Sequence, residues 1–159
     1  MIKQQKDFIK KPIQAKQVLN DPICYAKPVS FSRGIRIDLG KYSILFISGT
    51  ASVDKKGKTI HKGNFSLQAK RTFKNITFLL KSEGASWQDV VKTTCYLKDM
   101  RYYDEFNKIR NEFYKKMNLN PFPASVCIEA GLCRPELLVE IEAIAILQRD
   151  NARKIRNPK

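Results

Sequence analysis

The chain has 159 residues, of which 43% are hydrophobic and 28% are charged. This length suits one domain, and the apolar fraction is too high for an intrinsically disordered chain. No apolar run approaches the roughly 20 residues of a membrane span, and the basic N-terminus lacks the apolar segment of a secretory signal. We therefore expect a cytoplasmic protein without membrane contact.

The net charge of +15 is concentrated at the two ends of the chain. Five lysines against one aspartate give +4 within residues 1–16, and five basic residues against one aspartate give +4 within residues 149–159. Such tails either make weak contacts with RNA or acidic surfaces or serve as solubilising, poorly ordered ends. The sequence leaves both interpretations open.

The first predicted elements form a hairpin. Residues 1 to about 27 are rich in lysine, and Pro12 and Pro22 interrupt any helix there. Residues 35–39 alternate between apolar and polar side chains, as a half-buried strand does, and a Gly-Lys turn leads into the apolar residues 42–48. We expect two antiparallel strands.

The rest of the chain alternates between helical and strand patterns. Further elements are expected at 66–84 (helix), 90–97 (strand), 101–117 (helix), 124–130 (strand) and 137–147 (strand). This order predicts an α+β fold, a mixed sheet of about six strands with two helices on one face. We divide the chain into an N-terminal basic extension (1–27), the domain (28–148) and a basic C-terminal tail (149–159).

Cysteine and histidine usage argues against a metal or cofactor site. Cys24, Cys95, Cys127 and Cys133 include no Cys-x-x-Cys pair, and His61 is the single histidine. Metal sites usually show clustered ligand spacing, and no glycine-rich phosphate loop is present. We expect free thiols and no cofactor.

Three sequence patterns carry a family resemblance. They are Ile-Leu-Phe-Ile-Ser-Gly-Thr at 44–50, the helix-to-strand passage at 84–99, and Pro-Ala at 123–124 followed by Val-Glu-Ile-Glu-Ala-Ile-Ala at 139–145. Together they resemble the YjgF/RidA (L-PSP) superfamily. The resemblance implies a homotrimer whose clefts, each lined by two subunits, hydrolyse reactive enamines and imines in the deaminase branch.

The candidate site residues follow from that resemblance. Glu140 takes the position of the carboxylate that orients a water, and Asn107, Cys127 and Ser48 match residues that line the cleft. Ser125 stands where the deaminase branch has an arginine that grips the substrate carboxylate. A hydroxyl cannot supply a positive charge or a two-pronged donor, so the chain resembles an arginine-lacking branch.

The departures resemble the C-terminal half of chorismatases, which hydrolyse an enolpyruvyl ether. The similar segments are 31–33, 46–52 and 133–140, together with His61. Arg33 and Arg134 are then the candidates to replace the missing anion clamp. Arg134 either does so or forms a structural ion pair with Glu140, and Arg33 either binds ligand or faces water.

Period-two alternation places Glu140 and Glu142 on one side of the last strand. If subunit contacts cover that side, burial would raise the pKa of Glu140 and suit it to general acid or base catalysis. Otherwise both carboxylates are solvated or paired.

Three functions stay open. The first is a Rid-type enzyme that acts on a small carboxylate-bearing imine, enamine or enol ether. The second is a non-catalytic trimer that binds a metabolite and regulates a partner. The third is RNA binding or endoribonuclease activity, although no RNA-recognition motif or nuclease constellation is present.

Overall fold

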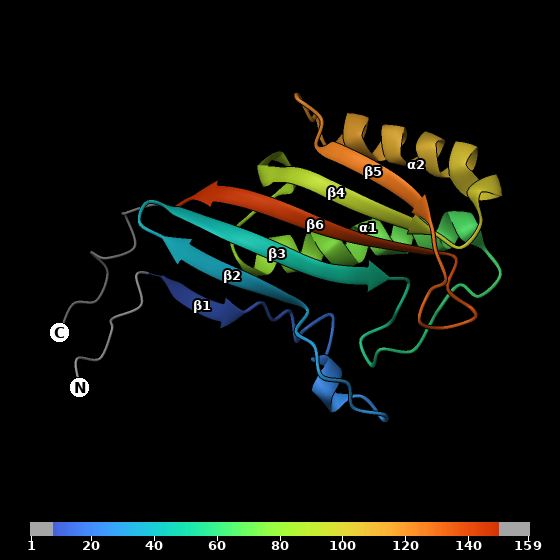
Figure 1. Cartoon of the computed structure of the whole chain (residues 1–159), viewed down its shortest axis with the longest axis horizontal. Helices are drawn as coiled ribbons and strands as arrows, with labels where there is room; N and C mark the ends of the chain where they lie inside the picture. Colours follow the sequence, from blue (N-terminus) through green and yellow to red (C-terminus); the bar gives the residue numbers. More distant parts are fainter. Residues whose placement is uncertain (1–7, 150–159) are drawn as a thin grey trace.

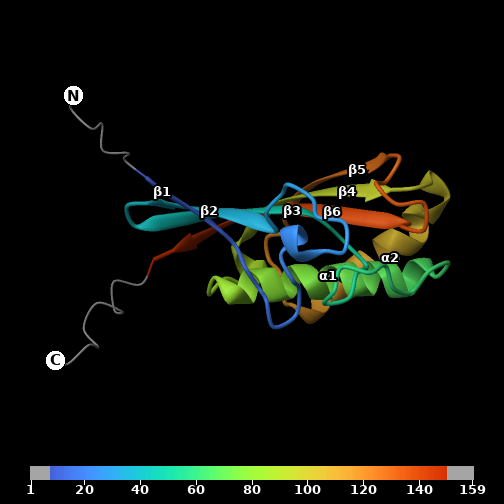
Figure 2. The same cartoon turned by 90° about the horizontal axis from the view of Figure 1, so that it is seen from below.

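In the computed structural model, which describes residues 8–149, two helices pack against one face of a six-stranded sheet (Figure 1, Figure 2). The strand order is β1-β2-β3-β6-β4-β5, with β4 and β5 parallel and the other neighbours antiparallel. This confirms the predicted α+β fold with a mixed sheet. The elements are β1 (Ile9–Pro12), β2 (Gly34–Leu39), β3 (Tyr42–Ala51), α1 (Phe65–Ser82), β4 (Val90–Leu97), α2 (Tyr103–Lys116), β5 (Ala124–Glu129) and β6 (Val139–Gln148).

The hairpin of β2 and β3 turns at Gly40, whose φ of 54° is a conformation that glycine adopts without strain. Next to it β3 pairs with β6, but the register shifts between Ile47 and Thr50. The two residues between them, Ser48 and Gly49, are therefore left out of the regular ladder. This irregularity bends the strand beside the pocket described below.

The start of the first helix is determined by a side-chain cap. Asn64 accepts a hydrogen bond from the Leu67 backbone nitrogen (2.9 Å), so α1 starts one residue earlier than the predicted residue 66. The second predicted helix opens with a short 3-10 turn, Met100–Tyr102, before α2. The last strand starts two residues later than predicted, because Leu137 still belongs to a turn closed on the Arg134 carbonyl.

An aromatic cluster joins the two helices to the sheet. Phe73 of α1 stacks on Phe113 of α2, with ring centroids 4.6 Å apart, and Trp87 packs edge-on against the same Phe113 ring. Aromatic pairs of these geometries stabilise a core beyond their buried area. The packing fixes α2 against the sheet, on the side where β4 and β5 run.

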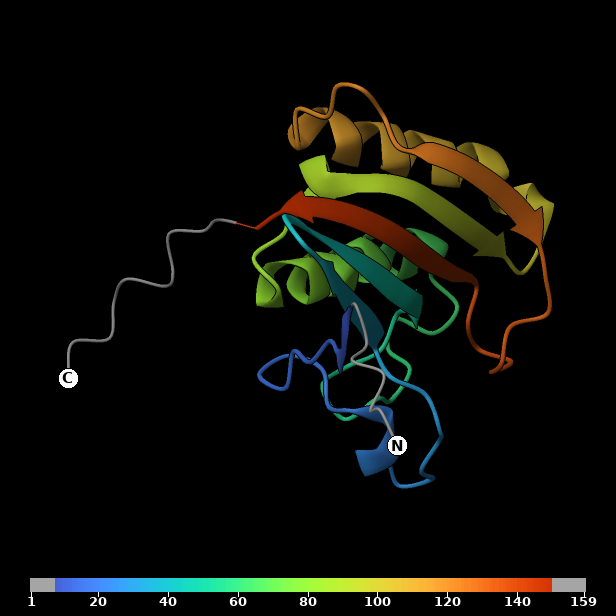
Figure 3. The same cartoon turned by 60° about the vertical axis from the view of Figure 1, so that its left-hand side comes forward.

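The prediction of residues 1–27 as an extension outside the domain requires correction for residues 8–27. β1 pairs with β2, with Ile9 opposite Asp38, and the side chains of Ile13 and Leu19 are fully buried in the core. The segment lies under the sheet edge away from α2 and β5 (Figure 3). Its few apolar residues are spread among lysines, so no periodic pattern revealed them. Residues 1–7 lie outside the described residues. So do residues 150–159, which make up nearly all of the predicted C-terminal tail.

The face of the sheet opposite the helices is apolar and uncovered. Phe46, Val126, Ile128 and Ile146 expose between 42% and 44% of their surface. A shallow hollow of about 280 Å³ on this face is lined by both apolar and polar residues, among them Phe46, Ile144, Lys92 and Glu142. The two helices cover only the other face, so within residues 8–149 no helix packs on this one.

Within residues 8–149 we find no helix long and apolar enough to cross a membrane.

Candidate functional site

A pocket of about 490 Å³ opens where β3 departs from regular pairing with β6. Two arginines and one glutamate line it, namely Arg33, Arg134 and Glu140, together with aromatic side chains at Tyr25 and Phe31. The three charged residues come from three different segments: the loop before β2, the loop between β5 and β6, and β6 itself. The fold thus gathers two cations and one carboxyl group around one small cavity.

Arg33 is buried, with 4% of its surface exposed, so the alternative that it faces water is wrong. Its Nε donates a hydrogen bond to the Asn20 carbonyl oxygen (3.2 Å), and its guanidinium lies 5.2 Å from the ring centroid of Tyr25. Its Nη2 is buried and has no hydrogen-bond partner among the described residues. Burial and the nearby charge of Arg134 lower the pKa of Arg33 to about 10.

A guanidinium with that pKa is still charged at neutral pH, and an unmet buried donor costs free energy. A ligand anion in the pocket would supply the missing acceptor.

Arg134 is held from the other side of the pocket. Its Nη1 donates hydrogen bonds to the Gly57 carbonyl oxygen (2.6 Å) and to Thr59 Oγ1 (3.2 Å). Its guanidinium lies 6.0 Å from the Tyr25 ring centroid, so Tyr25 contacts both arginines. No ion pair joins Arg134 to Glu140 within residues 8–149, and the structural ion-pair alternative is therefore wrong.

Glu140 is half-buried on β6 and has a raised pKa. Burial is the main cause, the neighbouring charge of Glu142 adds to it, and Arg134 partly opposes both. The carboxyl group packs directly on Gly49: a Cβ added to Gly49 would collide with Oε1 of Glu140 and lie 3.0 Å from its Cδ. The gap in the β3–β6 ladder and the missing side chain at Gly49 together make room for this carboxyl group.

Ser48 positions the loop that carries Arg33. Its Oγ donates to the Ser32 carbonyl oxygen (2.7 Å), and its backbone nitrogen donates to the Arg33 carbonyl oxygen (3.1 Å). Because its hydroxyl hydrogen is already donated, Ser48 can offer a ligand only its acceptor lone pairs.

The other predicted site residues, Asn107, Ser125 and Cys127, lie on the opposite face of the sheet. The β4–β5 register places Ser125 beside Thr93 and Cys127 beside Cys95, on the side that faces α2. Within one chain the candidate residues therefore form two groups. The pocket group contains Arg33, Ser48, Arg134 and Glu140, and the α2–β5 group contains Asn107, Ser125 and Cys127.

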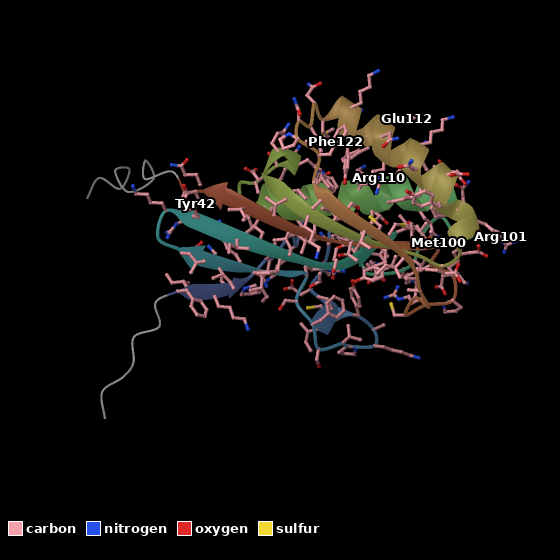
Figure 4. All side chains as sticks on the ribbon, turned by 45° about the horizontal axis from the view of Figure 1, so that its top comes forward. Tyr42, Met100, Arg101, Arg110, Glu112 and Phe122 are labelled. Carbon is pink, nitrogen blue, oxygen red and sulfur yellow. The ribbon has the colours of Figure 1, made fainter. Side chains whose placement is uncertain are left out.

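Arg110, which the sequence analysis did not single out, belongs to the α2–β5 group. Its Nη2 donates to Asn107 Oδ1 (2.7 Å) and its Nη1 donates to Ser125 Oγ (3.3 Å), so it lies between α2 and β5 (Figure 4). Its spacing of three residues from Asn107 places both on one helix face. That spacing is the signal that would have found it.

The cysteines near both groups are protonated at neutral pH. Burial raises the pKa of Cys127, with Arg110 opposing it, and burial and the charge of Glu140 raise that of Cys133. A thiol whose pKa is raised is a poor nucleophile. Among the described residues, no three histidine, cysteine or acidic side chains are grouped to hold a metal ion.

Comparisons with known proteins agree with the fold. The family model described as Endoribonuclease L-PSP matches residues 26–147. A RutC family protein of Pyrococcus abyssi is 34% identical over 127 residues, 76% of this chain and 97% of that protein. The crystal structure of the YjgF gene product of E. coli is 27% identical, with a TM-score of 0.68 over 87% of this chain and 99% of that one. The conserved Rid family protein YyfA of Yersinia pestis is 26% identical, with a TM-score of 0.70 over 87% and 100%.

The mixed sheet, the two helices on one face and the matched length define an α+β domain of the Rid type. The chain belongs to the Endoribonuclease L-PSP family, the YjgF/RidA superfamily.

Proposed function

We propose that the chain forms a homotrimer that hydrolyses small carboxylate-bearing imines, enamines or enol ethers in clefts between its subunits. The observation that carries this proposal is the pocket of Arg33, Arg134 and Glu140, where a buried guanidinium with an unmet donor lies near a carboxyl group of raised pKa. Perturbed titratable groups in a concave pocket are a mark of functional sites.

Two features support assembly through the open face of the sheet. The exposed apolar side chains there are of the kind that subunit contacts cover. The candidate residues also fall into two groups on opposite faces of the sheet. Contact between copies of the chain would join the pocket group of one subunit to the α2–β5 group of the next.

The two arginines suit a carboxylate. Arginine presents a planar fork of donors that matches a carboxylate in two parallel hydrogen bonds. Arg33 has a donor without a partner in a largely water-free position, where a charged hydrogen bond is strong. This interpretation assigns the chain to an arginine-lacking, chorismatase-like branch, in which Arg33 and Arg134 bind the anion although position 125 carries no arginine.

Glu140 supplies the chemistry. In imine hydrolysis the oxygen of a water adds to the imine carbon while Glu140 accepts the released proton. Glu140 passes this proton to the nitrogen, which gives a neutral carbinolamine. Glu140 then carries the proton of the carbinolamine hydroxyl to the amino group, so that the C–N bond breaks and ammonia leaves as the carbonyl of the keto acid forms. For an enol ether the protonated form of Glu140, favoured by its raised pKa, donates a proton to the alkene carbon. Water then adds to the resulting oxocarbenium carbon and gives one proton back to Glu140. The hemiketal breaks its C–O bond as its hydroxyl proton passes to the departing alcohol oxygen, and a keto acid remains.

The test supplies the purified protein with 2-aminoacrylate generated in situ and, separately, with an enolpyruvyl ether, and measures pyruvate release. We expect acceleration over buffer with one substrate class, and a loss of about 100-fold or more in Glu140→Gln, since general acid–base groups contribute at least that much. Glu112→Gln, an equal change on the exposed surface of α2, is the matched control.

If the protein accelerated pyruvate release from neither substrate class, the proposal that it is a hydrolase of these compounds would be rejected. Saturable ligand binding without turnover, unchanged in Glu140→Gln, would instead favour a regulatory trimer.

A further inference from the structure

The guanidinium of Arg110 is fixed by neutral groups alone. Asn107 Oδ1 and Ser125 Oγ accept its two hydrogen bonds, and its Cζ lies 5.4 Å from the Phe106 ring centroid. No carboxylate lies within ion-pair distance of it in the described part of the chain. A contrast is Arg36, which pairs with both Asp38 (2.6 Å) and Glu83 (3.2 Å). Arg110 is therefore a positioned positive charge without a counter-charge.

Ser125 adds a second donor at the same place. Its Oγ accepts hydrogen bonds from Arg110 Nη1 (3.3 Å) and Thr93 Oγ1 (3.1 Å). A hydroxyl has two acceptor lone pairs and one hydrogen. With both lone pairs used, the hydroxyl hydrogen of Ser125 faces only the sulfur of Cys95, a weak acceptor from which a carboxylate oxygen can take it. Ser125 is exposed on the edge strand β5.

We infer that Arg110 and Ser125 of one subunit together form a second contact for the ligand carboxylate, in addition to Arg33 and Arg134 of the neighbouring subunit, with the guanidinium of this half of the cleft supplied by α2. This inference rests on the proposed function, because it assigns a second anion contact to the same composite cleft. The remaining N–H groups of Arg110 and the O–H of Ser125 are neighbouring donors, and two carboxylate oxygens require a pair of neighbouring donors.

The inference also explains why a serine is compatible with carboxylate binding here. Ser125 is small enough to leave room for the longer Arg110 side chain, which enters from the neighbouring helix and reaches its hydroxyl. A single helical turn fixes Arg110 relative to Asn107, and this reduces the entropy lost when a ligand orders the side chain. The ligand carboxylate that this site would bind is that of the 2-oxo acid released in the proposed reaction.

The experiment measures binding of pyruvate and of pyruvamide, its uncharged amide, by isothermal titration calorimetry. We expect the wild-type protein to prefer pyruvate, and Arg110→Gln to weaken pyruvate binding by about 10-fold or more, the usual effect of losing a charge-assisted hydrogen-bond pair. Pyruvamide binding should change little. Ser125→Ala should weaken pyruvate binding less, because it removes one neutral donor.

The matched control is Lys108→Gln, which removes one positive charge from the exposed surface of the same helix. Equal pyruvate affinity in wild type and Arg110→Gln, with pyruvate still preferred over pyruvamide, would overturn the inference and leave the proposed function intact. A wild-type protein that does not distinguish the two ligands would overturn both.

A second readout does not depend on the variant folding. In the wild-type protein the NMR signal of the Arg110 Nε–H group should shift on titration with pyruvate and stay in place with pyruvamide. An unchanged signal at saturating pyruvate would contradict direct contact with Arg110.

Discussion

Replacing Gly49 with alanine tests whether the position of the Glu140 carboxyl group matters for activity. The new Cβ would collide with Oε1 of Glu140 and stand 3.0 Å from its Cδ. The atoms it meets are the far end of a flexible side chain, so the strand itself need not move. We expect the carboxyl group to rotate away from the pocket that Arg33 and Arg134 line.

The expected magnitudes separate a catalytic effect from a folding effect. Gly49 is not among the residues with positive φ, so alanine fits its backbone and reduces the freedom of the unfolded chain. Such substitutions stabilise by about 0.4–1 kcal/mol, which offsets the cost of moving the carboxyl group. Activity should fall by about 100-fold, as for loss of a general acid or base.

The assay compares turnover and urea unfolding of Gly49→Ala with those of Gly131→Ala. A Cβ added at Gly131 meets nothing within 4 Å, and its backbone also lacks a positive φ, so this variant should keep full activity. Wild-type turnover in Gly49→Ala would refute the reasoning, because a displaced Glu140 would then be unimportant. A loss of stability of several kcal/mol would refute it differently, by showing that the strand cannot accept a side chain.

Further predictions concern stability. Leu19→Ala should cost about 2–5 kcal/mol of unfolding free energy, because Leu19 is fully buried; an effect no larger than that of the exposed Ile23→Ala would exclude the N-terminal segment from the core. Glu140→Gln should stabilise the fold at pH 7 but not below about pH 4. The raised pKa of folded Glu140 means that its charged form costs free energy in the folded state, and this cost is present only once pH has risen through that pKa. Equal differences in unfolding free energy between variant and wild type at both pH values, measured by urea titration, would contradict this. Asp38→Asn should show the reverse dependence. Burial would raise the pKa of Asp38, but hydrogen bonds from Ser43 and Arg36 outweigh burial and lower that pKa. The substitution should therefore cost about 1–3 kcal/mol of unfolding free energy at pH 7, and this cost should shrink as pH falls below about 4. Acid unfolding identical to that of the wild type would rule this out.

The sequence predicted the regular elements because their patterns are local. The alternation of β2 and the β-branched run of β4 determine which face each side chain takes, and both strands are found where they were expected. β1 was missed because what makes it a strand is its partner: Ile9 to Pro12 pair with β2 through backbone groups that carry no side-chain signature. Long-range pairing of this kind cannot be read from a lysine-rich segment.

The site was only partly predictable for a similar reason. Family resemblance located Arg33, Arg134 and Glu140, but not that Tyr25 would contact both guanidiniums or that Arg33 would be buried. Those facts depend on how the N-terminal segment folds back over the pocket. Arg110 was missed because its contact with Ser125 joins a helix to a strand that lie 15 residues apart in sequence.

The short strand β1 also protects one border of the sheet. It is an edge strand, and the unpaired backbone N–H and C=O groups of an edge strand can pair with a strand of another chain. Its four residues are exposed, two of them are lysines, and Pro12 has no N–H to donate. This border of the sheet is therefore a poor template for adding a further strand, so copies of the chain that met edge to edge would not join through β1.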